Sequence, residues 1–420
     1  MREMKDSGIE WIGKVPVEWK IDNPQYHFSQ RKDRAKQGMV QLTASQKYGV
    51  ITQTEYMERT GANIVTVQKD FDILKLVCAG DFVIHMRSFQ GGLEYSEKTG
   101  SISSAYVMLI PSNTIREPRY YKWFFKSSNY IDALSSTSNL VRDGQAMRWS
   151  NFIQLPILFP PAEEQQRIAD FLDAKCAEID ALTADIQTQI DTLEQYKRSV
   201  ITETVTKGLN PDAKMKDSGI QWIGNMPAHW DVIRGKYILR YMQKPVREDD
   251  GVITCFRDGE VTLRSNRRED GFTMSDKEIG YQGIDVGDLV VHGMDGFAGS
   301  IGISNSRGKA SPVLNVLDTD QCKRYIMYYL RSMAYSDVFL ALATGIRVRS
   351  CDLRWNKLAE LSYPVPPLDE QNAIVKHIDS VLSKADAVIA DKKAQLATLD
   401  EYKKSLIFEY VTGKKEVPAP

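Results

Sequence analysis

The sequence MKDSGIEWIG at Met4–Gly13 returns as MKDSGIQWIG at Met215–Gly224, with Glu10 and Gln221 as the one difference. A polar phrase kept almost unchanged over this distance indicates a tandem duplication, because sequence that repeats at long range is the signature of a repeated structural unit. The extent of the repetition therefore sets the first division of the chain into parts.

Two further pairs of stretches repeat at one common distance of 206 residues. They are LPILFPPAEEQQRIADFLD (Leu155–Asp173) with LSYPVPPLDEQNAIVKHID (Leu361–Asp379), and EQYKRSVI (Glu194–Ile201) with DEYKKSLI (Asp400–Ile407). A weaker echo links GDFVIHMRSFQGG (Gly80–Gly92) with GDLVVHGMDGFAG (Gly287–Gly299). The rest of the two stretches between these repeats looks unrelated. We call the repeated stretches the frame and the stretches between them the inserts. The chain is therefore predicted to run in the order frame, insert, frame, insert.

Two long helices are predicted to follow the consecutive prolines at 160–161 and 366–367. Acidic residues fill the first turn of each, and Gly208 and Gly413 lie near the ends. Mostly apolar residues recur in a 3-4 alternation in one shared register, as a coiled coil requires. The alternating positions are 172, 176, 179, 183, 186, 190, 193, 197 and 200, and 378, 382, 385, 389, 392, 396, 399, 403 and 406. We expect a mutual coiled coil, with two separately packed amphipathic helices as the alternative.

Each insert contains short β-type runs broken by glycine and polar turns. DFVIHM and AYVMLI are examples in the first insert, and GDLVVH and SIGIS are examples in the second. Short helices are predicted at Arg119–Lys126 and Lys323–Met333. The predicted class is therefore α+β, with two mixed domains and two long helices.

Composition restricts the class of protein. With 42% hydrophobic and 26% charged residues in 420, the chain can bury more than one core, and no apolar run reaches the ~20 residues of a membrane span. The beginning of the sequence lacks the apolar core of a signal peptide. Five cysteines show no metal-type spacing. We expect a cytoplasmic protein.

Charge is distributed unevenly between the inserts and the helices. Residues 20–155 carry 17 Lys and Arg against 12 Asp and Glu, and residues 231–360 carry 19 against 18. The helices are more acidic, with 6 against 11 in residues 161–214 and 7 against 8 in residues 366–414. The asymmetry weakly favours inserts that meet nucleic-acid phosphates.

Catalytic motifs are missing from the sequence. It contains no aromatic-ended Asn/Asp-Pro-Pro motif of amino-methyltransferases, no dinucleotide-binding loop and no P-loop. GFAGSIG (Gly296–Gly302) is better explained as a turn between strands. The five histidines form no metal pattern. We therefore predict a protein without an active site, metal site or bound cofactor of its own.

The frame sequences resemble a known family. MKDSGIEWIGKVPVEW, FPPAEEQQRIADFLD, PPLDEQNAIVKHID and EYKKSLI are similar, in kind and order, to the specificity subunit of type I restriction–modification systems. The resemblance covers essentially the whole chain. It implies two target-recognition domains spaced by two long antiparallel coiled-coil helices, with pseudo-two-fold symmetry. The expected boundaries are 1–160 and 209–365 for the recognition domains, 161–208 and 366–414 for the spacer helices, and 415–420 for a tail.

The resemblance also implies a function. Each recognition domain would read one half of a bipartite target in double-stranded DNA, while the helices set the gap and dock two methyltransferase subunits. Two restriction/motor subunits could join the complex, and AdoMet, ATP and magnesium would belong to these partners. A helix over about residues 163–207 would span roughly 67 Å, which is one to two turns of DNA. Alternatives are a stand-alone methyltransferase or nuclease with degenerate motifs, and a scaffold without DNA affinity.

Candidate DNA contacts follow from side-chain chemistry, because Arg and Gln form bidentate contacts with guanine and adenine edges. The candidates are His85, Arg87, Gln90, Arg142, Gln145 and Arg148 in the first half, and His292, Asp295, Arg347, Arg349 and Arg354 in the second. For each arginine, phosphate contact or solvation is the alternative to base reading. The two histidines could equally be packed strand ends. Trp149 and Trp355 recur in the frame, so they are predicted to pack.

Overall fold

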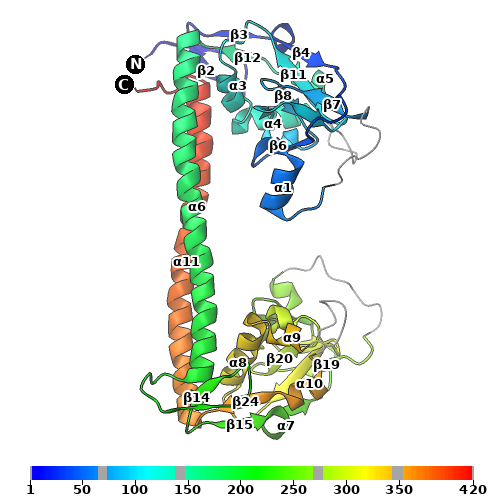
Figure 1. The fold of residues 1–420 in the computed structure, drawn as a ribbon, viewed down its shortest axis with the longest axis vertical. Coiled ribbons are helices and arrows are strands. Elements are labelled where there is room, and N and C mark those ends of the chain that lie inside the picture. The colour runs from blue at the N-terminus through cyan, green and yellow to red at the C-terminus, as the bar shows by residue number, and fades with distance from the viewer. Residues whose placement is uncertain (1, 65–72, 138–146, 268–277, 343–352, 419–420) are drawn as a thin grey trace. The chain divides into compact units, whose positions relative to one another are not determined.

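The computed structural model describes residues 2–64, 73–137, 147–267, 278–342 and 353–418 (Figure 1). It divides into two compact units. Unit 1 comprises residues 1–186 and 394–420, and unit 2 comprises residues 187–393. Each unit therefore contains part of both long helices, and each is described by itself.

The long helices are α6 (Ala162–Lys207) and α11 (Leu368–Val411). Each begins after two prolines, where a buried glutamine folds back onto the proline carbonyl: Gln165 Nε2 donates to Pro160 O, and Gln371 Nε2 donates to Pro366 O, both at 2.9 Å. Acidic side chains occupy both first turns, as the helix dipole favours. The sequence predicted both helices to within two or three residues at each end.

Side chains of the predicted alternation line the contact between α6 and α11 within each unit. Buried members are Leu172, Cys176, Ile179, Ile186 and Leu406 in unit 1, and Ile190, Ile378, Ala385 and Ile389 in unit 2. Lys403 Nζ lies 2.6 Å from Asp180 Oδ1 in unit 1, and Lys197 Nζ lies 2.5 Å from Asp386 Oδ1 in unit 2. In each of these pairs a residue from the C-terminal half of one helix contacts a residue from the N-terminal half of the other, so the helices are antiparallel. The mutual coiled coil is confirmed over separate helices.

The two inserts share one fold. Unit 1 has a four-stranded antiparallel sheet in the order β4-β11-β8-β9, and unit 2 has one in the order β16-β23-β20-β21. Their bounds are Phe28–Arg31, Val107–Pro111, Phe82–Ile84 and Glu94–Tyr95, and Arg240–Met242, Leu314–Asp318, Leu289–His292 and Ile301–Ile303. The two sheets have the same topology, so the two inserts share one plan, as the expected pseudo-two-fold symmetry requires, although their sequences look unrelated beyond one echo.

Smaller antiparallel ladders also recur in both units. Unit 1 pairs β5 (Leu42–Ser45) with β6 (Gly49–Thr52) and β7 (Lys75–Val77) with β10 (Gly100–Ile102); unit 2 pairs β17 (Ile253–Cys255) with β18 (Val261–Leu263) and β19 (Gln282–Ile284) with β22 (Gly308–Ala310). In the frames, β1 (Met4–Asp6) pairs with β2 (Lys14–Pro16), β3 (Lys20–Asp22) with β12 (Ile157–Phe159), β13 (Met215–Asp217) with β14 (Asn225–Pro227), and β15 (Asp231–Arg234) with β24 (Ser362–Val365).

Short helices complete each unit. They are α1 (Gln53–Thr60), α2 (Ser88–Gly91), α3 (Pro118–Phe124), α4 (Ser128–Ser136) and α5 (Trp149–Phe152) in unit 1, and α7 (Gly235–Ile238), α8 (Lys323–Tyr335), α9 (Val338–Ala341) and α10 (Trp355–Glu360) in unit 2. The structure confirms the helices predicted at Arg119–Lys126 and Lys323–Met333, as α3 and α8. Within the described ranges, no helix combines the length and apolar character that a bilayer span needs.

An aspartate on each long helix fastens the helix to its unit. Asp173 Oδ1 accepts from Trp123 Nε1 of α3 at 2.9 Å, and Asp379 Oδ1 accepts from Tyr328 Oη of α8 at 2.5 Å. An arginine one turn earlier, Arg119 or Arg324, also reaches the same aspartate. The two aspartates are 206 residues apart, so this contact belongs to the repeat.

The repeated opening sequence and the tryptophan that follows it pack against the end of a long helix in each unit. We call this packing surface the seat. In unit 1 the β1–β2 hairpin leads to the fully buried Trp19, which packs beside Gly413 just after α11. Tyr120 Oη donates to Val411 O at 2.7 Å. In unit 2 the β13–β14 hairpin leads to the buried Trp230 beside Gly208, just after α6, and Tyr325 Oη donates to Val205 O at 3.0 Å. The phrase therefore occurs twice because two helix ends need the same seat.

Gly413 provides a test of this seat. Its φ is 68°, and a Cβ there would lie 2.5 Å from Pro16 Cγ and 2.9 Å from Trp19 Cζ2. We expect Gly413→Ala to lower the free energy of unfolding by about 3 kcal/mol, because backbone strain and overpacking add. Gly8→Ala is the control: its φ is 71° with nothing within 4 Å, so about 1 kcal/mol is expected. Urea unfolding followed by tryptophan fluorescence measures both, and equal losses would contradict the close seat.

Candidate nucleic-acid interface

The turn after the third strand of each sheet holds several of the predicted contact residues. We call residues 85–91 of unit 1 and 292–298 of unit 2 the post-strand turns. In unit 2, His292 Nδ1 accepts the backbone N–H groups of Met294 at 3.2 Å and Asp295 at 3.0 Å. Burial lowers the pKa of His292. The ring is therefore neutral at pH 7 and carries its proton on Nε2.

The equivalent histidine of unit 1 uses the same backbone contact but is more deeply buried. His85 Nδ1 accepts the Arg87 N–H at 3.2 Å, while His85 Nε2 lies 3.6 Å from the buried Glu94 Oε1. Only 5% of His85 is exposed. Of the two alternatives that the sequence left open, burial favours a packing role for His85, while Arg87 and Gln90 are exposed on the same turn.

A β-hairpin adds a second segment to this surface in unit 2. The turn between β17 and β18 carries Arg257, whose Nη2 lies 3.2 Å from Asp295 Oδ1 of the post-strand turn. Sequence reasoning missed Arg257, although Asp258 and Gly259 form the dipeptide typical of hairpin turns between two β-type runs. That signal would have placed the arginine at a turn.

The two segments border a hollow of about 760 Å³ in unit 2. Its polar lining comes mainly from the hairpin and the post-strand turn, and it includes Arg257, Asp258, Arg264, Arg267, His292 and Asp295. Three arginines against two aspartates leave the lining net positive. The hollow therefore offers donors to an electronegative ligand while keeping acceptors of its own.

Arg354 lies against the same turn. Leu353 N donates to Gly293 O at 2.8 Å, and Asn315 Nδ2 donates to Leu353 O at 3.0 Å. A Cβ on Gly293 would lie 3.9 Å from Arg354 Cγ. Unit 2 therefore brings together His292, Asp295 and Arg354, as one surface would require.

The other predicted residues have different outcomes. Arg148 is exposed just before α5 in unit 1. Arg142, Gln145, Arg347 and Arg349 lie outside the described residues. Trp149 packs near Phe152 with ring centroids 5.7 Å apart, and Trp355 packs near Tyr241 at 6.0 Å, so their predicted packing role is confirmed. The roles of the other candidates in DNA contact stay predictions.

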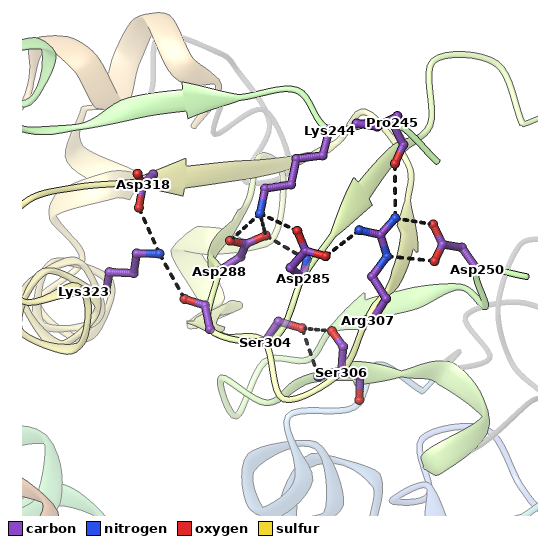
Figure 2. Close-up of polar contacts among 11 residues, drawn as sticks. Lys244, Pro245, Asp250, Asp285, Asp288, Ser304, Ser306, Arg307, Asp318 and Lys323 are labelled. Carbon is purple, nitrogen blue, oxygen red and sulfur yellow. Dashed lines mark hydrogen bonds and ion pairs between the residues drawn. The ribbon is translucent and has the colours of Figure 1, made fainter. Parts of the chain in front are cut away.

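A network of ion pairs fixes the opposite end of strand β20 (Figure 2). Lys244 Nζ lies 2.7 Å from Asp288 Oδ2 and 2.8 Å from Asp285 Oδ2. Arg307 makes two parallel bonds to Asp250, from Nε at 2.9 Å and Nη2 at 2.8 Å, and also pairs with Asp285. Lys244 and Arg307 lower the pKa of Asp285 to about 2. These contacts fasten the loops around residues 244–250 and 304–308 to the sheet.

Unit 1 contains the equivalent anchor in another form. Arg31 Nε and Nη2 bind Asp81 at 2.7 and 2.9 Å, and the Cys78 N–H donates to Asp81 Oδ2 at 2.8 Å. In unit 2 the Asp285 N–H donates to Asp288 Oδ2 at the same distance. Asp81 and Asp288 follow glycines with φ of 97° and 88°. The GD of the weak sequence echo is therefore a buried aspartate anchor.

These features define a class of protein: an internally duplicated α+β chain whose second unit has an arginine-lined hollow. No group of three His, Cys, Asp or Glu in the described part of the chain is placed to hold a metal ion. Residues 27–192 match the family model of the type I restriction modification DNA specificity domain.

Relatives extend the match along the chain. The type I restriction enzyme MjaVIII specificity subunit of Methanocaldococcus jannaschii is 22% identical over 96% of this chain and 94% of its own length. The EcoBI specificity subunit of Escherichia coli is 22% identical over 71% and 67%. A chain solved in work on the assembly and conformational transition of the type I R-M system has a TM-score of 0.66 at 14% identity, covering 96% of this chain and 99% of that one. The predicted resemblance to type I specificity subunits is confirmed.

Asp288 allows a test of the anchor beneath the post-strand turn. We expect Asp288→Ala to lower the free energy of unfolding by about 3 kcal/mol, because it leaves the half-buried Lys244 without its closest carboxylate. Adding Lys244→Met should recover part of the loss. Asp320→Ala is the matched control, since Asp320 likewise pairs with a basic side chain, that of Arg240, but is 84% exposed, and less than about 1 kcal/mol is expected. Urea titration compares all variants, and equal losses for Asp288 and Asp320 would contradict the anchor.

Proposed function

We propose that this chain is the DNA-recognition subunit of a type I restriction–modification complex, with each unit reading one half of a bipartite DNA sequence. The observation that carries the proposal is one fold built twice, with a repeated frame and inserts that differ in sequence on the same sheet topology. A repeated frame suits two copies of one partner, and divergent inserts suit two different half-sites.

The recognition domains in this proposal are residues 1–160 and 209–365, and the spacer helices are residues 161–208 and 366–414. At ~1.5 Å per residue, α6 with its 46 residues is about 69 Å long, the length of roughly two turns of DNA. The helices then set an unread gap between the half-sites and dock two methyltransferase subunits.

Recognition is separate from catalysis in this proposal. AdoMet, ATP and magnesium belong to the methyltransferase and restriction subunits. This chain recognises the DNA sequence to which those subunits are brought. The relatives are named as specificity subunits, which supports a non-catalytic role. They give no support to a stand-alone methyltransferase or nuclease.

Methylation mapping tests the proposal directly. The chain is co-expressed with its cognate methyltransferase subunit in a methylation-free host, and methyladenine is located across the genome. We expect a split motif with two short defined parts and a constant gap. A stable complex that binds DNA but yields no methylation would overturn the modification role.

Exchange of one insert tests the division of labour. Replacing residues 20–155 by the insert of another type I specificity subunit should change one half of the methylated motif and leave the other half and the gap unchanged. The reciprocal exchange of residues 231–360 is the matched control and should change the opposite half. A change in both halves from either exchange would contradict independent reading.

A further inference from the structure

We propose that one position of the small hairpin in each unit reads a base: Arg257 a guanine in one half-site, and Gln46 an adenine in the other. This inference rests on the proposed function and deepens it by naming base and residue. We call this position, the first of the three unpaired residues in the hairpin turn, the tip position.

Strand register makes Gln46 and Arg257 equivalent. In unit 1, Ser45 pairs with Gly49, which leaves three residues in the turn, beginning with Gln46. In unit 2, the Phe256 N–H donates to Glu260 O at 2.8 Å and extends the β17–β18 ladder by one pair. Three residues again remain, beginning with Arg257. The tip position is therefore fixed by backbone pairing in both units.

Each tip lies against a glycine, Gly91 in the post-strand turn of unit 1 and Gly299 directly after the post-strand turn of unit 2. A Cβ on Gly91 would lie 2.6 Å from Gln46 Cγ, and a Cβ on Gly299 would lie 2.7 Å from Arg257 O. At Gly299 the close atom is backbone, so a larger residue would displace the tip, whereas at Gly91 a larger residue would displace the Gln46 side chain. The tip residue is therefore held beside the post-strand turn.

Each tip side chain is oriented by one contact to that turn. Gln46 Nε2 donates to Arg87 O at 2.9 Å, and Arg257 Nη2 lies 3.2 Å from Asp295 Oδ1. The Arg257 side chain is 65% exposed, and Asp295 is its one ion-pair partner within the described residues. Gln46 keeps its carbonyl oxygen and one N–H, and Arg257 keeps most of its guanidinium donors.

These remaining groups match different base edges. An arginine donates in parallel to O6 and N7 of guanine, whereas a glutamine donates to N7 and accepts from N6 of adenine. A glutamine can donate to a phosphate but brings no positive charge to it, so a charge-based phosphate anchor is not common to the two tips. Asp295 and Asp258 also place carboxylates beside Arg257, which disfavours a phosphate there.

A buried polar atom in the same hollow gives independent support for a ligand. Ser300 is 1% exposed and lines the hollow beside Arg257 and Asp295. Its Oγ has no hydrogen-bond partner among the described residues. A buried hydroxyl without a partner is costly, so a bound group that completes its hydrogen bonding is consistent with this site.

The test is methylation mapping with tip variants in the complete methyltransferase complex. We expect Arg257→Gln to change the preference at one position of one half-site from guanine to adenine, and Gln46→Arg to make the reverse change at one position of the other. Arg240→Gln is the matched control, because Arg240 is half-exposed, ion-paired and not part of the hollow lining; its motif should be unchanged. Asp295→Asn should relax the choice at the Arg257 position.

A second measurement tests the guanine contact itself if a variant complex does not assemble. DNA carrying 7-deazaguanine at each guanine of the motif in turn removes the N7 acceptor from the unmodified protein's target. We expect binding to weaken about tenfold at one guanine, because one of the two bonds of the bidentate contact is lost while the bond to O6 remains. Either of two results for Arg257→Gln would overturn the base-reading role. One is an unchanged methylation motif, and the other is DNA binding that weakens equally for all DNA sequences. Failure of the unmodified complex to give any split motif would instead overturn the proposed function.

Discussion

Each unit is completed by a helix end that comes from the other sequence repeat. Tyr120 binds the carbonyl of Val411 across 291 residues of sequence, and Tyr325 binds that of Val205 across 120. These hydroxyls are buried donors that would each be costly to leave unpaired. Because a tryptophan and a close-packed glycine complete the same seat, the helix ends cannot be moved without disturbing a core. Both long helices depend on this exchange for the packing of their C-terminal ends.

In each unit one strand of the sheet has an aspartate anchor at one end and the post-strand turn at the other. A buried aspartate after a left-handed glycine, Asp81 or Asp288, binds a basic side chain of a neighbouring segment and fixes one end of the central strand. The opposite end of that strand leads into the post-strand turn. Different side chains can therefore occupy the turn and the hairpin tip without a change in the support. This arrangement explains how one fold carries two dissimilar surfaces.

The frame was predictable from the sequence because its signals are local. Proline pairs, acidic first turns and a 3-4 alternation gave both helices and their coiled coil. Two similar recognition domains were expected, but the strand order that their sheets share was not predictable, since equivalent strands such as β11 and β23 share apolar character rather than identity. The Arg-Tyr dipeptide that recurs at 119–120 and 324–325 was visible in the sequence, but two residues are too few to identify equivalent helices. Of the candidate contacts, the structure brings His292, Asp295 and Arg354 together, while Arg257 needed the hairpin register to be recognised.

The exchange of helix ends also fixes the order in which the units can be completed during synthesis. Unit 2 is one continuous segment, residues 187–393, so all its parts are available once that segment has left the ribosome. Unit 1 begins the sequence but needs residues 394–420, which are made later. The seat around Trp19 in the nascent chain therefore stays unoccupied until the C-terminal residues are made, while unit 2 can already fold. The unit that is started first is finished last.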